Sequence, residues 1–169
     1  LPIGIIGIWR WAVWLGKLII AKKYTPKKGE YKTKVSVITP VYNEDPKLFL
    51  RAINSWRKEK PFEIIAVIDY TDKTNVNLFK DFSKTFKGAK LIITKKPGKR
   101  DALADGIKVA KGEIVALVDS DTLWKEGLIE KTLPPFKDPK VAGVGTRQTV
   151  LNPKSLAQKL FDIHLDLRY

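Results

Sequence analysis

From residue 35 onward, short apolar runs rich in β-branched residues alternate with stretches that are apolar only at every third or fourth position. Each run predicts a strand that is buried on both faces. The runs cover residues 35–40, 63–69, 89–94, 112–119 and 140–146. Strands that alternate with helices predict an α/β fold, in which helices flank a mostly parallel sheet.

Helical spacing is clearest between the first two predicted strands. Asp45 is placed to cap a helix there, and Pro46 suits its first position. The inward stripe has helical spacing and consists of Phe49, Ala52, Ile53 and Trp56. Further helices are expected over roughly residues 74–86, 101–112 and 153–168. The one over 101–112 is expected to bury Leu103, Ile107 and Ala110.

Residues 1–21 are apolar apart from Arg10 and Lys17, and a helix of that length is about 32 Å long. We expect a membrane helix here, either transmembrane or, because Arg10 lies near its middle, interfacial. A buried core helix and a cleaved signal peptide are the less favoured alternatives. Residues 22–34 hold six lysines and one glutamate, which predicts a basic linker on the cytoplasmic side of the membrane. The predicted location is therefore the membrane, with the following domain cytoplasmic.

The chain carries 32 Lys and Arg residues against 18 acidic ones, a net charge of +14, which favours an anionic partner. Nucleic acid is not expected, because no basic face interleaved with aromatics and no nucleic-acid-binding motif is found. There is no cysteine and one histidine, so thiolate sites are excluded and a metal would be held mainly by oxygen ligands. That ligand set suits Mg²⁺ or Mn²⁺.

Polar residues that could bind a ligand or take part in catalysis follow the first four predicted strands. They are Asn43 and Glu44, then Asp69, then Lys99 and Arg100, and finally Asp119 and Asp121. Because ligands bind at the carboxyl ends of strands in open α/β sheets, these residues are expected to form one site.

Asp119 and Asp121 can point to the same side of a turn, where their charges repel unless a divalent metal joins them. The alternative is an Asx-turn that caps a helix starting near Lys125. Lys99 and Arg100 at a helix start favour phosphate, although a solvated basic loop is the alternative.

Three residues at the ends of the first two predicted strands suit a nucleoside. Tyr42 could stack on a base, with Glu44 capping or contacting that base, and Asp69 could accept hydrogen bonds from a base or a ribose. The alternative for all three is that they only form the connections that follow the strands.

Four segments resemble, in this order and spacing, family 2 glycosyltransferases with the GT-A fold: "VSVITPVYNED", "IIAVIDYTDKTN", "KPGKRDALADGIKVAKGEIVALVDSD" and "AGVGTRQTVLNPKSLAQKL". The Gly-Lys-Arg and Val-Gly-Thr-Arg segments are similar to the processive membrane-bound branch, which includes hyaluronan, chitin and cellulose synthases, and to hyaluronan synthase most closely. The resemblance covers residues 35–169. It implies a nucleotide-sugar-binding GT-A domain over residues 35–150.

The resemblance also implies roles for the predicted site. The base of a UDP-sugar would be held by Pro40, Tyr42, Glu44 and Asp69. Lys99 and Arg100 would contact the nucleotide or its diphosphate, Asp119 the ribose or the sugar, and Asp121 a Mg²⁺ or Mn²⁺ ion. The expected activity is inverting transfer of a sugar to a growing polysaccharide, with Asp119 and Asp121 as the catalytic carboxylates.

The resemblance has one important gap. The general base and the Gln-x-x-Arg-Trp motif that follow in the family are not found in this chain. Residues 151–169 predict an amphipathic helix leading toward a missing acceptor half, which a longer enzyme or a partner chain would supply. The alternatives are an enzyme of the dolichol-phosphate-sugar-synthase type with a lipid-phosphate acceptor, and a non-catalytic nucleotide-sugar-binding or assembly subunit.

Overall fold

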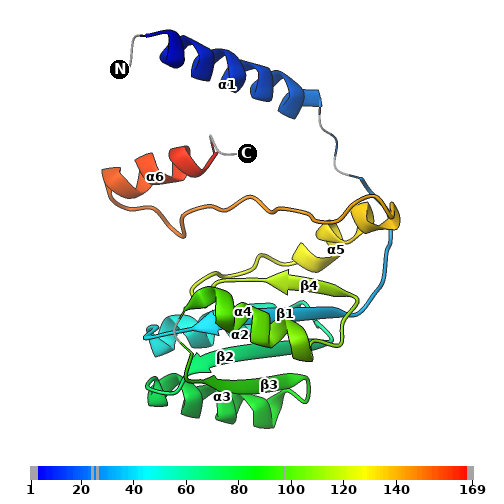
Figure 1. Cartoon of the computed structure of the whole chain (residues 1–169), viewed down its shortest axis with the longest axis vertical. Helices are drawn as coiled ribbons and strands as arrows, with labels where there is room; N and C mark the ends of the chain where they lie inside the picture. Colours follow the sequence, from blue (N-terminus) through cyan, green and yellow to red (C-terminus); the bar gives the residue numbers. More distant parts are fainter. Residues whose placement is uncertain (1–3, 24, 26, 97, 167–169) are drawn as a thin grey trace. The chain divides into compact units, whose positions relative to one another are not determined.

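A computed structural model describes residues 4–23, 25, 27–96 and 98–166. The chain divides into two compact units, one of residues 30–134 and one that combines residues 1–29 with 135–169. The larger unit contains a parallel four-stranded sheet in the order β3-β2-β1-β4 (Figure 1). Its strands are β1 (Val35–Val41), β2 (Glu63–Asp69), β3 (Ala89–Thr94) and β4 (Ile114–Leu117). The predicted α/β architecture is confirmed.

Helices cover both faces of this sheet. The first face is covered by α2 (Pro46–Lys58) and α3 (Lys73–Thr85), and the second by α4 (Lys99–Val109). Asp45 caps α2 as predicted, because its Oδ1 accepts hydrogen bonds from the backbone N–H groups of Lys47 (2.7 Å) and Leu48 (3.2 Å). The predicted inward stripe of α2 is fully buried.

Two expectations about the strands are wrong. Residues 141–150 form neither helix nor strand, so the strand predicted over 140–146 is absent. An apolar alternation becomes a strand only where a neighbour supplies hydrogen-bond partners, and the described β4 pairs with β1 alone. Burial on both faces holds for β1 and β2 but not for β3 and β4, which are only partly buried because they lie at the sheet edges.

The helix predicted over 101–112 also differs in detail. α4 begins at Lys99, so Lys99 and Arg100 lie in its first turn rather than in a loop. It buries Ala102 and Gly106, whereas Ile107 is 47% exposed. A Cβ atom on Gly106 would overlap the side chain of Ile38 in β1, so α4 packs directly onto the sheet at this glycine.

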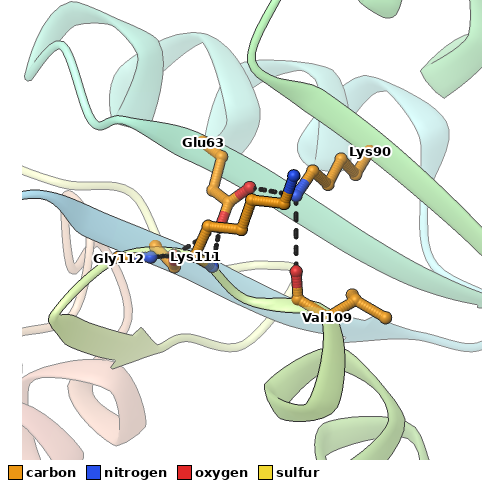
Figure 2. Close-up of polar contacts among 6 residues, drawn as sticks. Glu63, Lys90, Val109, Lys111 and Gly112 are labelled. Atoms are coloured by element: carbon orange, nitrogen blue, oxygen red, sulfur yellow. Dashed lines mark hydrogen bonds and ion pairs between the residues drawn. The ribbon is translucent and has the colours of Figure 1, made fainter.

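A buried ionic cluster joins the amino-terminal ends of β1, β2 and β3 (Figure 2). Glu63 is 2% exposed and forms an ion pair with Lys90 of β3 at 2.5 Å. Its Oε1 accepts hydrogen bonds from Ser36 Oγ (2.6 Å) and from the N–H of Lys111 (2.5 Å). Lys90 also donates to the carbonyl of Val109 at 3.3 Å. The cluster therefore fixes the end of α4 to three strands.

The smaller unit contains α1 (Ile5–Lys23) and α6 (Leu156–Asp166), while the short α5 (Leu128–Thr132) follows β4 and a 3₁₀ turn covers Pro134–Lys137. Among the described residues, no helix has both the length and the apolar content that a membrane crossing requires. The membrane-crossing helix expected over residues 1–21 is thus not found, because Arg10, Lys17 and Lys22 fall within α1. Part of the helix expected over residues 151–169 is observed as α6, in which Leu156, Leu160 and Ile163 are each more than half exposed.

Candidate functional site

A cleft of about 830 Å³ opens at the carboxyl ends of the strands. It lies within the larger unit and brings together the predicted site residues except Asn43 and Arg100, which do not line it. The predicted residues that line it are Pro40, Tyr42, Glu44, Asp69, Lys99, Asp119 and Asp121. The expectation that separate strand ends would form one site is therefore met by the geometry.

The β1 and β2 side of the cleft is suited to a planar ring. Tyr42 is 74% exposed and follows the last residue of β1, so one apolar ring is available for stacking. Asp69, the last residue of β2, accepts hydrogen bonds at Oδ1 from Thr71 Oγ1 (2.5 Å) and from the N–H of Thr71 (2.9 Å). These hydrogen bonds from the Thr71 side chain and backbone lower the pKa of Asp69. Asp69 is thus an anionic acceptor at neutral pH.

Glu44, in the loop after β1, contacts both the turn after β4 and helix α3 (Lys73–Thr85). Its Oε2 accepts a hydrogen bond from Ser120 Oγ at 2.8 Å, and its Oε1 accepts one from the N–H of Asp45 at 3.1 Å. Its backbone carbonyl accepts a hydrogen bond from the side-chain amide of the buried Asn75 at 2.9 Å. The Glu44 carboxylate therefore supports the residue between the two aspartates as well as lining the cleft.

The first turn of α4 lies opposite the end of β4. Gly98 precedes this helix with φ of 110°, a conformation that L side chains rarely adopt. Lys99 then places its Nζ 2.5 Å from Oδ1 of Asp119. An ammonium group at a helix amino terminus favours an anion at this position.

Asp119 and Asp121 lie on a tight turn, in which the N–H of Thr122 donates to the carbonyl of Asp119 at 3.1 Å. Both aspartates are exposed. They do not cap a helix near Lys125, because α5 starts at Leu128. The turn therefore presents both carboxylates to the cleft and leaves them available to a ligand.

The two aspartates fit a metal ion whose coordination is completed by the oxygens of a bound ligand. Across the described residues, no group of three or more His, Cys, Asp or Glu side chains is placed to hold a metal ion. Mg²⁺ is commonly bound by one or two carboxylates together with substrate phosphates and water, and exposed carboxylate oxygens meet that need. Asp121, whose Oδ1 lies 3.4 Å from Thr122 Oγ1, and the neighbouring Asp119 would hold such an ion.

Several residues of the cleft were not expected from the sequence. They include Tyr70, Thr71, Thr94, Lys95, Lys96 and Ser120. Thr71 follows Asp69 by two positions, and this Asx-turn spacing could have identified it. Lys96 pairs with Asp105 of α4 at 3.7 Å, a contact between segments that no local pattern predicts.

The comparison with protein families decides the assignment. The model described as glycosyl transferase family 2 matches residues 36–161. The chain belongs to this family. Its matched region contains the whole sheet except the first residue of β1, and every residue of the cleft.

Relatives of this family 2 chain include NDP-glycosyltransferase ltbB of Aspergillus luteorubrus, which is 30% identical over 163 residues, covering 90% of the chain and 39% of that protein. A probable glycosyltransferase, YdaM of Bacillus subtilis, is 30% identical over 139 residues, covering 77% of the chain and 33% of YdaM. The chain thus spans between a third and two fifths of these curated relatives.

A solved structure is similar in fold. It is the mannosyltransferase PcManGT from Pyrobaculum calidifontis, in complex with GDP-Man and Mn²⁺, with a TM-score of 0.64 and 24% sequence identity. The match covers 81% of this chain and 41% of PcManGT. At this identity the likeness concerns the fold, and it agrees with the GT-A-like sheet expected from the sequence.

Proposed function

We propose that the cleft binds the nucleoside diphosphate part of a nucleotide sugar, and that the chain is the donor-binding part of an inverting glycosyltransferase. The observation that carries this proposal is the convergence of an exposed aromatic ring, a basic helix start and two exposed aspartates on one cleft. In such a donor, the ring would match the base, the cation would match the diphosphate, and the two carboxylates would match the metal that accompanies the diphosphate.

Individual roles follow from position. Tyr42 would stack on the base, Asp69 would accept hydrogen bonds from it, and Pro40 would line the same part of the cleft. Lys99 would contact the diphosphate, and Asp119 the ribose or the sugar. The family resemblance adds Arg100 to the diphosphate contacts, although the described cleft is lined without it.

Asp121, with Asp119 beside it, would hold Mg²⁺ or Mn²⁺. A divalent ion supplies charge neutralisation for the departing nucleoside diphosphate. Lys99 would add a second positive charge on the same leaving group. PcManGT, which shares the fold, holds Mn²⁺ together with GDP-Man, and this supports a metal-assisted donor site.

The transfer forms a bond between an acceptor hydroxyl oxygen and the anomeric carbon, and breaks the bond from that carbon to the diphosphate. A general base must take the hydroxyl proton. The family resemblance assigns that base to an acidic motif that is not found in this chain. We propose that an acceptor half, from a longer chain or a partner, supplies it.

The finer activity we propose is hyaluronan-synthase-like transfer from a UDP-sugar to a growing glycan, supported by the Gly-Lys-Arg and Val-Gly-Thr-Arg segments. A lipid-phosphate acceptor is the alternative that the net charge of +14 favours. A subunit that binds the donor without turnover is a second alternative.

We also propose that α1 lies along a membrane surface, with the family 2 domain on the cytoplasmic side. Arg10 and Lys17 are seven residues apart, so they share one side of the helix. Ile8, Trp9 and Ile19 are each more than half exposed and would enter the lipid. Flotation with vesicles containing anionic lipid tests this: the full chain should float, and a variant with Ile8→Gln and Ile19→Gln should not.

Calorimetry with UDP and GDP, each with Mn²⁺ and with EDTA, tests the donor site. The proposal expects binding that Mn²⁺ strengthens, and preference for UDP over GDP supports the uracil assignment. Preference for GDP would keep the nucleotide site and overturn the UDP assignment. No binding of either nucleotide by folded protein would contradict the proposed site.

A further inference from the structure

The backbone just after Asp121 depends on the side chains of α2. Residues 122–127 form neither helix nor strand, so their polar groups need partners elsewhere. The indole N–H of Trp56 donates to the carbonyl of Thr122 at 2.8 Å. The hydroxyl of Ser55 accepts from the N–H of Trp124 at 3.0 Å.

Glu59 extends the same set of contacts. Its two carboxylate oxygens accept hydrogen bonds from the N–H groups of Gly127 (2.9 Å) and Ile129 (3.1 Å). Ser55 and Trp56 lie in the last turn of α2, and Glu59 is the residue that caps the carboxyl end of this helix. We call these three residues the α2 grip. The grip thus provides partners for four backbone groups between residues 122 and 129.

The grip is rigid at its centre. Trp56 is fully buried in the main core and its ring centroid lies 6.1 Å from that of Trp124. The Ser55 hydroxyl is oriented because it donates to the carbonyl of Ala52 at 2.7 Å. A side chain held this firmly transmits its own position to the backbone that it binds.

The grip acts one residue away from the proposed metal ligand. Thr122 closes the turn that carries Asp119 and Asp121, and its carbonyl is the group that Trp56 binds. On the other side of the turn, Ser120 is held by Glu44 at 2.8 Å. The Asp121 backbone is therefore fixed from both sides, while its carboxylate stays exposed.

We propose that the α2 grip sets the position of Asp121, which makes Ser55 and Trp56 positioning residues for metal binding in the cleft. This inference rests on the proposed function of the cleft. A site that supplies one or two carboxylates depends strongly on where those oxygens lie, because the metal and the diphosphate must reach them together.

Ser55→Ala tests the grip with the smallest change. Ser83→Ala is the matched control, because Ser83 also donates to a carbonyl three residues earlier in its own helix, at 2.6 Å, and lies in α3. Ser55→Thr should keep Mn²⁺ binding at the wild-type level, because threonine retains the hydroxyl. A hollow of about 700 Å³ beside Ser55 leaves room for the added methyl group.

The decisive measurement is the apparent affinity for Mn²⁺ in the presence of UDP, with UDP binding in EDTA measured beside it. A positioning role predicts three- to tenfold weaker Mn²⁺ binding in Ser55→Ala, with UDP binding in EDTA unchanged. Equal weakening of both, or the same loss in Ser83→Ala, would show a general structural effect and overturn the proposal.

Amide hydrogen exchange separates this inference from the proposed function. In the ligand-free protein, Ser55→Ala should accelerate exchange across residues 119–129 and leave exchange in the sheet the same as in Ser83→Ala. If the wild type binds no nucleotide, the proposed function fails, and exchange still decides whether the grip holds the turn. Unchanged exchange at residues 119–129 would contradict the grip itself.

Discussion

The side-chain nitrogen of Lys99 lies 2.5 Å from Oδ1 of Asp119 and so joins the first turn of α4 to the turn after β4. The side chain of Lys99 is 59% exposed and that of Asp119 is 50% exposed. Under the proposed function, a diphosphate in the cleft would compete with Asp119 for Lys99. Donor binding would then exchange an internal ion pair for a ligand contact.

We expect Lys99→Gln to weaken UDP binding about tenfold, which corresponds to about 1.4 kcal/mol. The free energy of unfolding should change by less than about 1 kcal/mol, because exposed ion pairs contribute little to stability. Calorimetry and urea unfolding measure the two effects. Lys84→Gln, which removes an exposed pair with Asp81 on α3, should change neither quantity by as much.

Glu63 supports stability rather than binding. Burial raises its pKa, but hydrogen bonds and charge from Lys90, with hydrogen bonds from Ser36 and the Lys111 N–H, bring the pKa below the ordinary value of 4.5. We expect Glu63→Gln to lower the free energy of unfolding by about 2–4 kcal/mol near neutral pH, because Lys90 loses its buried partner. Urea unfolding at pH 7 measures this loss.

The same cluster predicts a pH dependence. A carboxyl whose pKa is lowered in the folded state stabilises the protein above the unfolded pKa, and this stabilisation is lost as pH falls through the folded pKa. The difference between wild type and Glu63→Gln should therefore shrink as pH is lowered below about 4.5. A difference that stays constant across that range would contradict the ionic role of Glu63.

Gly106 sets how closely α4 approaches the sheet. A Cβ atom there would overlap the side chain of Ile38 and crowd that of Val67. We expect Gly106→Ala to lower the free energy of unfolding by about 1–3 kcal/mol, despite the higher helix propensity of alanine. Thermal unfolding measures this loss. Gly143→Ala is the control, because a Cβ atom at Gly143 meets nothing within 4 Å. Equal melting temperatures for the two variants would contradict this packing.

The sequence predicted the parts of the fold that depend on local patterns. Asp45 and Pro46 marked the start of α2, and the strand ends marked Asp69, Asp119 and Asp121. What it missed depends on neighbours in space. Whether residues 140–146 form a strand depends on a pairing partner, and the burial of Gly106 rather than Ile107 depends on how α4 meets the sheet.

The same limit applied to the site. The strand-end rule brought Asp119 and Lys99 together correctly, since parallel strands end at one edge. The partners of the turn were not predictable, because Trp56 and Thr122 are 66 residues apart and neither carries a motif. Glu44 was expected to contact a base, and its hydrogen bond to Ser120 could be found only from the fold.

The most direct test of the account is calorimetry of UDP binding with and without Mn²⁺ for the wild type, Asp121→Asn and the control Asp81→Asn on α3. We predict that Mn²⁺ strengthens UDP binding in the wild type and in Asp81→Asn, and that Asp121→Asn abolishes this gain. UDP binding by folded wild type that Mn²⁺ does not strengthen, or a gain that survives in Asp121→Asn, would contradict a metal-diphosphate site at the end of β4.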